Sequence, residues 1–277
     1  MSYDLHLQGA LPTDAALRQH LSARPNFRVF DGFASYDHLG ASFSLRWEGD
    51  PLERLSFHMN YVRPGWFSHA AEPELRALVE AFGLSVEDPQ SEGMGSGPYS
   101  REGFLRGWGW GNSWATRTMA SFGSVGPNTP RLPRAQNLAA YVWNAELEAT
   151  RAAFEDELNP CFVPQIFLLS LPKQAATPLR AVAWTGDMAL ALPEVDALLL
   201  GDKMARTRDL EGLLARWPWV ERPGRAPESP PLRYRALQFD AVPADLAAAV
   251  KAAAVKLPKQ TTRLSPAAVL DGEDLAG

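Results

Sequence analysis

The chain has 277 residues and a formal net charge of −5, and 46% of its residues are hydrophobic. This composition predicts a globular protein with a sizeable core and argues against a disordered chain, which would have few aromatic residues. No stretch of about 20 apolar residues is present, so the sequence predicts no membrane helix. The start resembles no signal peptide and Cys161 is the single cysteine. We therefore expect a cytoplasmic protein without disulfide bonds.

The negative charge is concentrated at the N-terminal side of the chain. Residues 1–98 hold six more acidic than basic side chains, whereas the rest of the chain is nearly neutral. Nucleic-acid binding usually requires a strongly basic segment, so we expect no nucleic-acid partner. The acidic segment would instead favour a basic protein partner, or would serve solubility alone.

Residues 1–98 show strand and helix patterns in turn. Residues 3–8 alternate between apolar and polar side chains, as a half-buried strand does. Two more alternating stretches flank the turn 48–51 and predict a hairpin. Gly83 is the expected C-terminal cap of a helix. We predict strands at 3–8, 42–47, 54–62 and 84–88, and helices at 12–23 and 72–83.

The remaining residues give a second set of elements. A stretch rich in glycine, serine and proline at 88–98 predicts an exposed loop or a linker. It divides the chain into an N-terminal α+β lobe, 1–98, and a C-terminal α+β lobe with central helices, 99–277, although one continuous domain is the alternative. We predict helices at 100–122, 134–158, 208–217 and 243–255, strands at 163–171, 179–184, 196–201 and 232–239, and a polar loop at 222–231. The fold class is α+β, with antiparallel or mixed sheets and helices packed on one face.

Residues 101–114 combine tryptophan with glycine. On a helix, Gly103, Gly107, Gly111 and Ala115 recur every four residues and form one row of small side chains. Each helix-interior glycine costs about 1 kcal/mol relative to alanine, so close packing or function must offset the cost. One interpretation is a buried helix that crosses another helix, with Gly107 and Gly111 against its backbone.

The other interpretation of this stretch is a binding site. Trp108 and Trp110 would form an aromatic cleft for a sugar, a peptide loop or a cationic ligand, and Asn112 would lie at its rim. A small-ligand carrier or sensor would use such a cleft.

The polar side chains of the predicted strands are candidates for a second site. His6, Ser44, Arg46, Ser56, His58 and Asn60 share one face if these strands are neighbours. A polar face is the usual solvent side of an antiparallel sheet, but Arg46, His58 and Asn60 would also suit a docking surface. A catalytic version would pair His58 with Ser56 or Ser44, and no third, orienting group is evident from the sequence.

Motifs for cofactors and metals are absent from the sequence. It contains no phosphate-binding loop, zinc-protease motif or dinucleotide fingerprint, so we expect neither cofactor nor metal. Four acids of the second lobe, Asp187, Glu194, Asp196 and Asp202, are interpreted as turn residues, with a catalytic role as the alternative. Cys161 is interpreted as a small apolar residue.

The second lobe resembles a known group of proteins. "FVPQIFLLSL" at 162–171, followed by "AVAWTGDMALALPEVDALLLGDK" at 181–203, resembles uncharacterised bacterial cytoplasmic proteins found beside toxin genes. Such proteins are often immunity proteins, which bind and block one toxin. The resemblance implies a binding role and carries over no catalytic residues.

These observations lead to three hypotheses about function. The first is a non-enzymatic protein-binding protein, an immunity protein that neutralises a toxin, with Glu72, Glu74 and Glu80 along one helix contributing to its acidic surface. The second is a hydrolase whose site uses His58 or the acids of the second lobe. The third is a carrier of a small ligand near Trp108.

Overall fold

The computed structural model describes residues 1–277 except 91, 158–160, 175, 225–229, 238–243 and 276–277. The chain forms two compact units, one of residues 1–129 with 267–277 and the other of residues 130–266. Both combine helices with antiparallel or mixed sheets, so the predicted α+β class is confirmed. No helix among the described residues is long and apolar enough to span a bilayer.

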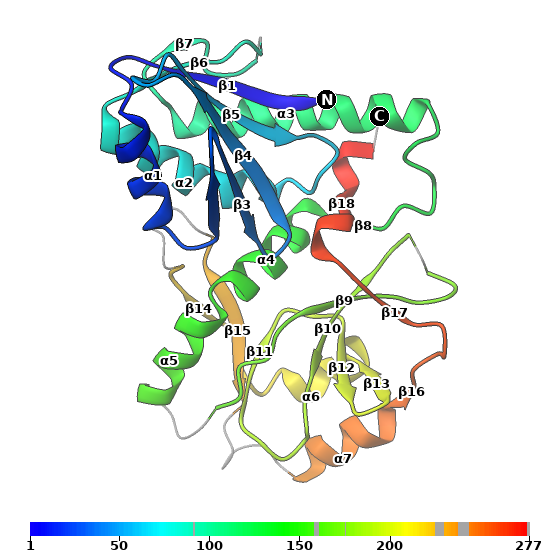
Figure 1. Ribbon diagram of the computed structural model, residues 1–277. Helices are drawn as coiled ribbons and strands as arrows, with labels where there is room; N and C mark the ends of the chain where they lie inside the picture. The colour runs from blue at the N-terminus through cyan, green and yellow to red at the C-terminus, as the bar shows by residue number, and fades with distance from the viewer. Residues whose placement is uncertain (91, 158–160, 175, 225–229, 238–243, 276–277) are drawn as a thin grey trace. The chain divides into compact units, whose positions relative to one another are not determined.

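A seven-stranded antiparallel sheet is the centre of the first unit (Figure 1). The predicted hairpin is present, with Leu45 opposite Phe57 in its register. The strand order is β2-β3-β4-β5-β1-β6-β7, so the first strand pairs with the end of the hairpin and with β6. The strands are β1 (Ser2–Gln8), β2 (Phe27–Phe30), β3 (Phe33–His38), β4 (Ala41–Glu48), β5 (Arg54–Asn60), β6 (Ser85–Glu87) and β7 (Ser96–Gly97).

Strands β2 and β3 were not among the sequence predictions. The alternation that defines β3 is short, with Ala34 and Tyr36 buried and Ser35 between them. Gly32 and Gly40 adopt positive φ angles of 61° and 91° at the turns before and after β3. Glycine adopts this conformation without steric cost, so these two positions allow three successive strands to form a meander.

Three helices cover one face of this sheet: α1 (Asp14–Ser22), α2 (Trp66–Phe82) and α3 (Arg101–Ser121) (Figure 1). Two of them begin at side-chain caps, because Thr13 accepts a hydrogen bond from the Ala16 N–H and Ser100 accepts one from the Gly103 N–H. The apolar side chains of the alternating strands point to this face and supply the core of the unit, including Tyr3, Phe57 and Leu45.

Helix α2 begins six residues earlier than the sequence predicted. The predicted start at residue 72 lies inside α2, and so does Pro73. Trp66 and Phe67, each only 1% exposed, fill the core in the first turn. Their burial offsets the backbone hydrogen bond that proline cannot make. The predicted cap is correct, since Gly83 ends the helix in the left-handed conformation with φ 62°.

Helix α3 contains the row of small residues, and the row is buried. A Cβ atom added to Gly107 would stand 2.7 Å from the hydroxyl of Tyr3 and 2.8 Å from the Cα atom of Gly93. One added to Gly111 would stand 2.3 Å from the hydroxyl of Tyr61. The predicted contact with a neighbouring backbone is therefore present at Gly107, where the backbone is that of Gly93. Gly111 instead faces the ring of Tyr61. The row thus packs against β1 and the loop containing Gly93, and not against the second helix that the sequence predicted.

The loop that follows β6 belongs to the first unit. The carboxylate of Asp88 accepts hydrogen bonds from the hydroxyl of Tyr3 at 2.7 Å and from the backbone N–H groups of Gln90 and Met94 at 3.0 and 2.9 Å. These bonds tie Asp88, Gln90 and Met94 to β1. The two compact units consequently divide at 129/130, after α3, and not at the glycine-rich stretch 88–98 where the sequence suggested a division.

The second unit has a mixed six-stranded sheet and an antiparallel three-stranded sheet, in the orders β16-β13-β12-β10-β9-β17 and β11-β15-β14. Only β10 and β12 pair in parallel within the larger sheet. The strands are β9 (Phe167–Ser170), β10 (Leu179–Ala183), β11 (Leu190–Pro193), β12 (Ala197–Leu200), β13 (Lys203–Arg206), β14 (Val220–Arg222), β15 (Leu232–Leu237), β16 (Val255–Lys256) and β17 (Thr262–Leu264). The helices of this unit among the described residues are α4 (Arg134–Ala145), α5 (Leu147–Glu157), α6 (Glu211–Leu214) and α7 (Ala244–Ala253). Two further strands of two residues each are β8 (Arg131–Leu132) in this unit and β18 (Leu270–Asp271) in the first.

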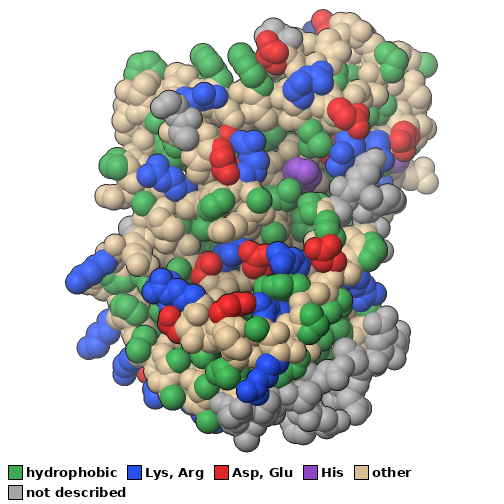
Figure 2. All heavy atoms as spheres, turned by 180° about the vertical axis from the view of Figure 1, so that it is seen from behind, with side chains coloured by type: hydrophobic (Ala, Val, Ile, Leu, Met, Phe, Trp, Pro, Cys, Tyr) green, Lys and Arg blue, Asp and Glu red, His purple; other side chains and the backbone are tan. Residues whose placement is uncertain are grey.

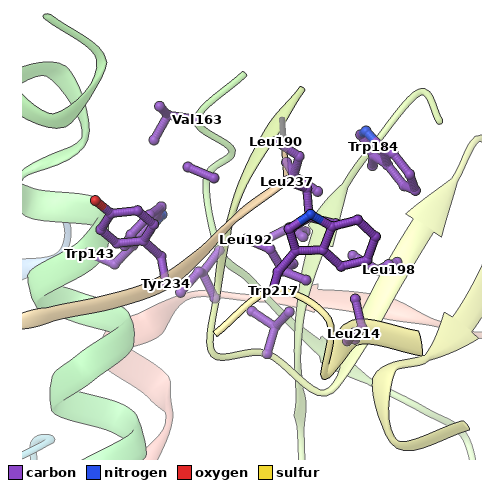
Figure 3. Close-up of a cluster of buried hydrophobic side chains, with 14 of the residues drawn as sticks. Trp143, Val163, Trp184, Leu190, Leu192, Leu198, Leu214, Trp217, Tyr234 and Leu237 are labelled. Carbon is purple, nitrogen blue, oxygen red and sulfur yellow. The ribbon is translucent and has the colours of Figure 1, made fainter. Parts of the chain in front are cut away.

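The core of the second unit is aromatic and aliphatic (Figure 3). Trp143, Trp184, Trp217 and Tyr234 are each no more than 9% exposed and come from α4, the residue after β10, the segment after α6 and β15. The indole N–H of Trp143 donates to the carbonyl of Pro164 at 2.7 Å, so this buried donor is satisfied.

Two helix predictions in this unit are wrong in extent. The stretch 134–158 is two helices, α4 and α5. The side chain of Asn144, near the end of α4, bonds to the backbone of Ile166, where it accepts at 2.9 Å and donates at 3.0 Å. The stretch 208–217 has only the four-residue α6 after a 3-10 turn. Residues 158, 238–239 and 243 of other predicted elements, and 225–229 of the predicted loop, lie outside the described residues.

Candidate functional site

The side of the seven-stranded sheet not covered by α1, α2 and α3 is polar, and we call it the open face. Strand register places its side chains in two rows across neighbouring strands. Directly opposite residues in antiparallel strands project to the same side, so each row is continuous. The first row is Arg28, Ser35, Ser44, His58 and Asp4, and the second is Phe33, Arg46, Ser56, His6 and Glu87.

A groove of about 770 Å³ lies on the open face. Arg46, His58 and Asn60, which the sequence analysis selected, all line it. Short hydroxyl side chains from β3 and β4 lie between them, so hydroxyl groups are accessible to a bound molecule. The residues that contribute to the groove through polar side chains are Ser2, Asn26, Arg28, Ser35, Asp37, Ser42, Ser44, Arg46, His58 and Asn60.

The two arginines of the groove have no acidic partner among the described residues. Arg28 and Arg46 are both exposed, and the guanidinium of Arg46 lies 5.9 Å from the ring centre of Phe33. Asp37 is the exposed acid of the groove. The groove therefore offers two guanidinium groups, each with several donors, to an acceptor on a bound molecule.

Asp4, His58 and Ser56 form a chain of hydrogen bonds on the open face. The Asp4 carboxylate contacts Nδ1 of His58, and Nε2 of His58 lies 3.0 Å from the hydroxyl of Ser56. A proton on Nδ1, donated to the carboxylate, leaves Nε2 free to accept from the serine hydroxyl. The third group that the sequence analysis did not find for a catalytic arrangement is thus Asp4.

Access to this chain is limited at the serine. Ser56 is only 6% exposed, and its hydroxyl also lies 3.4 Å from the carbonyl of Arg46, which it could donate to instead. A nucleophile must reach the carbonyl carbon of its substrate and needs donors for the resulting oxyanion. The hydrogen bonds hold both ring nitrogens of His58 in place. The Ser56 hydroxyl, in contrast, is poorly accessible to a substrate.

The acidic residues selected on α2 do not share one free surface. Glu72 is 3% exposed, and its carboxylate lies 3.3 Å from Nε of Arg76 and 3.8 Å from Nε of Arg101. Glu74 contacts Arg24 at 2.5 Å. Glu80 is exposed. The acidic surface predicted along this helix therefore excludes Glu72, because packing against α3 buries it and arginines neutralise it.

The tryptophan stretch separates into a buried and an exposed half. Trp108 is 1% exposed and its ring packs against Tyr3 and Tyr61, so the space beside it is filled. Asn112 is equally buried and its amide bonds to the backbone of Arg63. Trp110 is 49% exposed. The predicted cleft of these three residues is therefore not formed.

Hydrophobic side chains reach the surface elsewhere as well. Figure 2, which views the molecule from behind, shows them interspersed with basic and acidic side chains. Trp114 and Phe122 are 51% and 77% exposed and lie on the same helix as Trp110 or directly after it. Tryptophan is enriched where proteins bind one another, so the outer side of α3 is a secondary candidate for contact with a partner.

The acids of the second unit that the sequence analysis noted are mostly paired with bases. Arg180 is buried and contacts Asp196 at 3.2 Å and Glu194 at 3.7 Å. Asp202 lies 3.4 Å from the ammonium of Lys256, and Asp187 is exposed. In the part of the chain that the structure describes, no three His, Cys, Asp or Glu side chains converge as metal ligands would. Burial raises the pKa of the Cys161 thiol, as expected for a packed cysteine.

Sequence reasoning missed Asp4, Arg28 and Ser35 of the open face. Asp4 alternates with buried residues in a strand that was predicted, so it could have been included. The other two lie on β2 and β3, which were not predicted. Comparison with protein-family models, curated protein sequences and solved structures gives no significant match to this chain.

Proposed function

We propose that this protein binds another protein through the open face and acts as an immunity protein that neutralises a bacterial toxin. The observation that carries the proposal is the groove of about 770 Å³ on a polar sheet face, lined by short hydroxyls and two arginines without acidic partners among the described residues. A sheet face is rigid, so it can present these donors with little loss of conformational entropy on binding.

The chemistry of the groove favours a partner that inserts acceptor groups, such as backbone carbonyls and a carboxylate. Arg28 and Arg46 can each donate two parallel hydrogen bonds to one carboxylate. The basic partner expected from the sequence has less support, because Glu72 and Glu74 are neutralised within the protein. The toxin-blocking role rests on the resemblance of residues 162–171 and 181–203.

The test uses the full chain as bait in its native host, followed by purification of the recovered protein. A bulky side chain at the centre of the groove, in Ser44→Trp, should weaken binding of that partner at least tenfold by steric exclusion. Ser22→Trp, at the exposed end of α1 and away from the groove, is the matched control and should bind like the wild type. The partner should also be toxic when expressed alone, and co-expression of the wild type should restore growth.

Equal binding by Ser44→Trp, with its circular dichroism unchanged, would refute the assignment of the open face. A partner without toxicity would refute the immunity role and leave the binding role in place.

A second candidate function is ester or amide hydrolysis, and the Asp4–His58–Ser56 chain is the observation that favours it. Ser56 Oγ would attack the substrate carbonyl while Nε2 of His58 takes its proton. His58 would return that proton to the leaving group, and water would then release the acyl group in the same way.

Two measurements distinguish this candidate from the binding role. A fluorophosphonate probe should label Ser56 in the wild type but not in Ser56→Ala, and hydrolysis of p-nitrophenyl esters should fall at least a hundredfold in that variant. Absence of labelling together with unchanged ester turnover in Ser56→Ala would exclude the hydrolase.

A further inference from the structure

The second unit contains a groove of its own that is independent of the open face. It has a volume of about 630 Å³, within the usual range for small-ligand sites. The ends of β10 and β12, the turn into β13 and the C-terminal part of α7 form it. Its floor is largely apolar, with Trp184, Leu199 and Leu200 among the lining residues.

The apolar floor has a basic rim. Lys203 and Lys251 line the groove and are exposed, and neither has an acidic partner in the described part of the chain. Asp202 also lines the groove, but its carboxylate is 3.4 Å from the ammonium of Lys256, whose residue lies opposite Lys203 in the strand register. The net charge at the rim is therefore positive.

Lys251 and Leu200 both lie beside Gly186. The Cε atom of Lys251 would lie 3.8 Å from a Cβ atom placed on Gly186, and Cδ2 of Leu200 would lie 3.9 Å from the same point. The side chains of Lys251 and Leu200 thus approach the same point beside Gly186, and Lys251 is exposed, as expected for a lysine whose aliphatic part lies beside apolar surface. The indole N–H of Trp184 donates to the carbonyl of Met188 at 2.9 Å, so this polar group needs no ligand.

We infer that this groove binds a small anionic amphiphile, with an alkyl chain along Leu199, Leu200 and Trp184 and a carboxylate between the ammonium groups of Lys203 and Lys251. The apolar floor favours the chain because its burial removes apolar surface from water. The two ammonium groups favour a negative head group over a neutral or positive one. The inference does not depend on the proposed function, because it concerns the other compact unit.

The experiment is a calorimetric titration of the full-length protein with decanoate below its critical micelle concentration. Decanol and decyltrimethylammonium have the same chain with neutral and positive head groups. Decanoate should bind at least fivefold more tightly than either. From hexanoate to decanoate, each added methylene that becomes buried should strengthen binding roughly fourfold.

Variants locate the site. Lys203→Glu and Lys251→Glu should each weaken decanoate binding at least fivefold, and Leu200→Asp should weaken all three decyl ligands. Lys173→Glu is the matched control, since Lys173 is exposed in the same unit and does not line the groove. It should change affinity less than twofold.

Three results would overturn the inference. They are no detectable decanoate binding, equal binding of the three head groups, or equal loss of affinity in Lys173→Glu and the two groove variants. Circular dichroism of each variant ensures that a loss reflects the site and not unfolding. Failure here would leave the Ser44→Trp experiment unaffected, because that variant changes the first unit.

Discussion

Gly107 and Gly109 form a natural pair of test positions within helix α3. An added Cβ at Gly107 would stand 2.7 Å from the Tyr3 hydroxyl, 2.8 Å from the Cα atom of Gly93 and 3.3 Å from a carboxylate oxygen of Asp88. At Gly109, two residues from the nearest members of the row of small side chains, an added Cβ would meet nothing within 4 Å. Alanine substitution at the two sites therefore changes helix propensity equally and packing very differently.

The expected free-energy changes have opposite signs. Alanine in place of a helical glycine contributes about 1 kcal/mol of stability, so Gly109→Ala should be more stable than the wild type by about 0.5–1 kcal/mol. In Gly107→Ala the same gain is opposed by overpacking of about 1–3 kcal/mol. Displacement of the Tyr3 hydroxyl would also weaken its bond to Asp88, and such bonds to charged groups contribute about 1.5–3 kcal/mol. We expect a net loss of about 1.5–5 kcal/mol, with the upper end reached if the bond to Asp88 is lost.

Urea unfolding followed by circular dichroism measures both changes. The chain has two compact units, so two transitions are fitted if they separate, and the shift should occur in the one that reports α3. Gly107→Ala with wild-type stability or greater, or an equal shift in both variants, would show that the row of glycines does not serve close packing.

Three further predictions concern charge. Glu72→Gln should lower the free energy of unfolding by about 2–4 kcal/mol, because it leaves two arginines beside a buried neutral group, whereas exposed Glu80→Gln should change it by less than about 0.5 kcal/mol in the same melt. Burial lowers the pKa of His69 to about 4 in the folded protein. Below about pH 6.5 the unfolded chain therefore binds a proton at His69 that the folded protein does not bind. The free energy of unfolding should consequently fall by up to about 3 kcal/mol as the pH drops from about 6.5 to about 4. His69→Gln should reduce that fall, and an unchanged pH profile would contradict the assignment. Single- and double-stranded DNA and RNA probes should show no salt-sensitive binding near physiological salt, and a mobility shift there would contradict the charge argument.

The sequence pattern was most informative where elements are long and periodic. Strands β1, β4 and β5 and the Gly83 end of α2 were predicted because period-two alternation and a glycine cap are local properties. Helix α2 was placed too late, because its first turn is held by the burial of Trp66 and Phe67, which depends on tertiary packing. The short strands β2 and β3 depend on pairing with β4, which no local pattern specifies.

The candidate site was predicted in part for the same reason. Alternation alone placed His58, Arg46 and Asn60 on one polar face, and the structure places them in one groove. The selection of Glu72 and Trp108 as surface groups was not supported, because both are buried. A charged or aromatic residue on a helix has the same local pattern whether its neighbours are water or another helix.

The sequence by itself determined which residue types face inward along each strand, the α+β class, and the row of small residues on α3. Only the tertiary structure decided the strand register, and the register brings Asp4 to His58 and aligns Arg28 with Ser35 and Ser44. It also decided which charges are neutralised within the fold and which remain free for a partner. The physical reason is that side-chain direction follows from local backbone geometry, whereas register, burial and ion pairing depend on contacts between residues far apart in the chain.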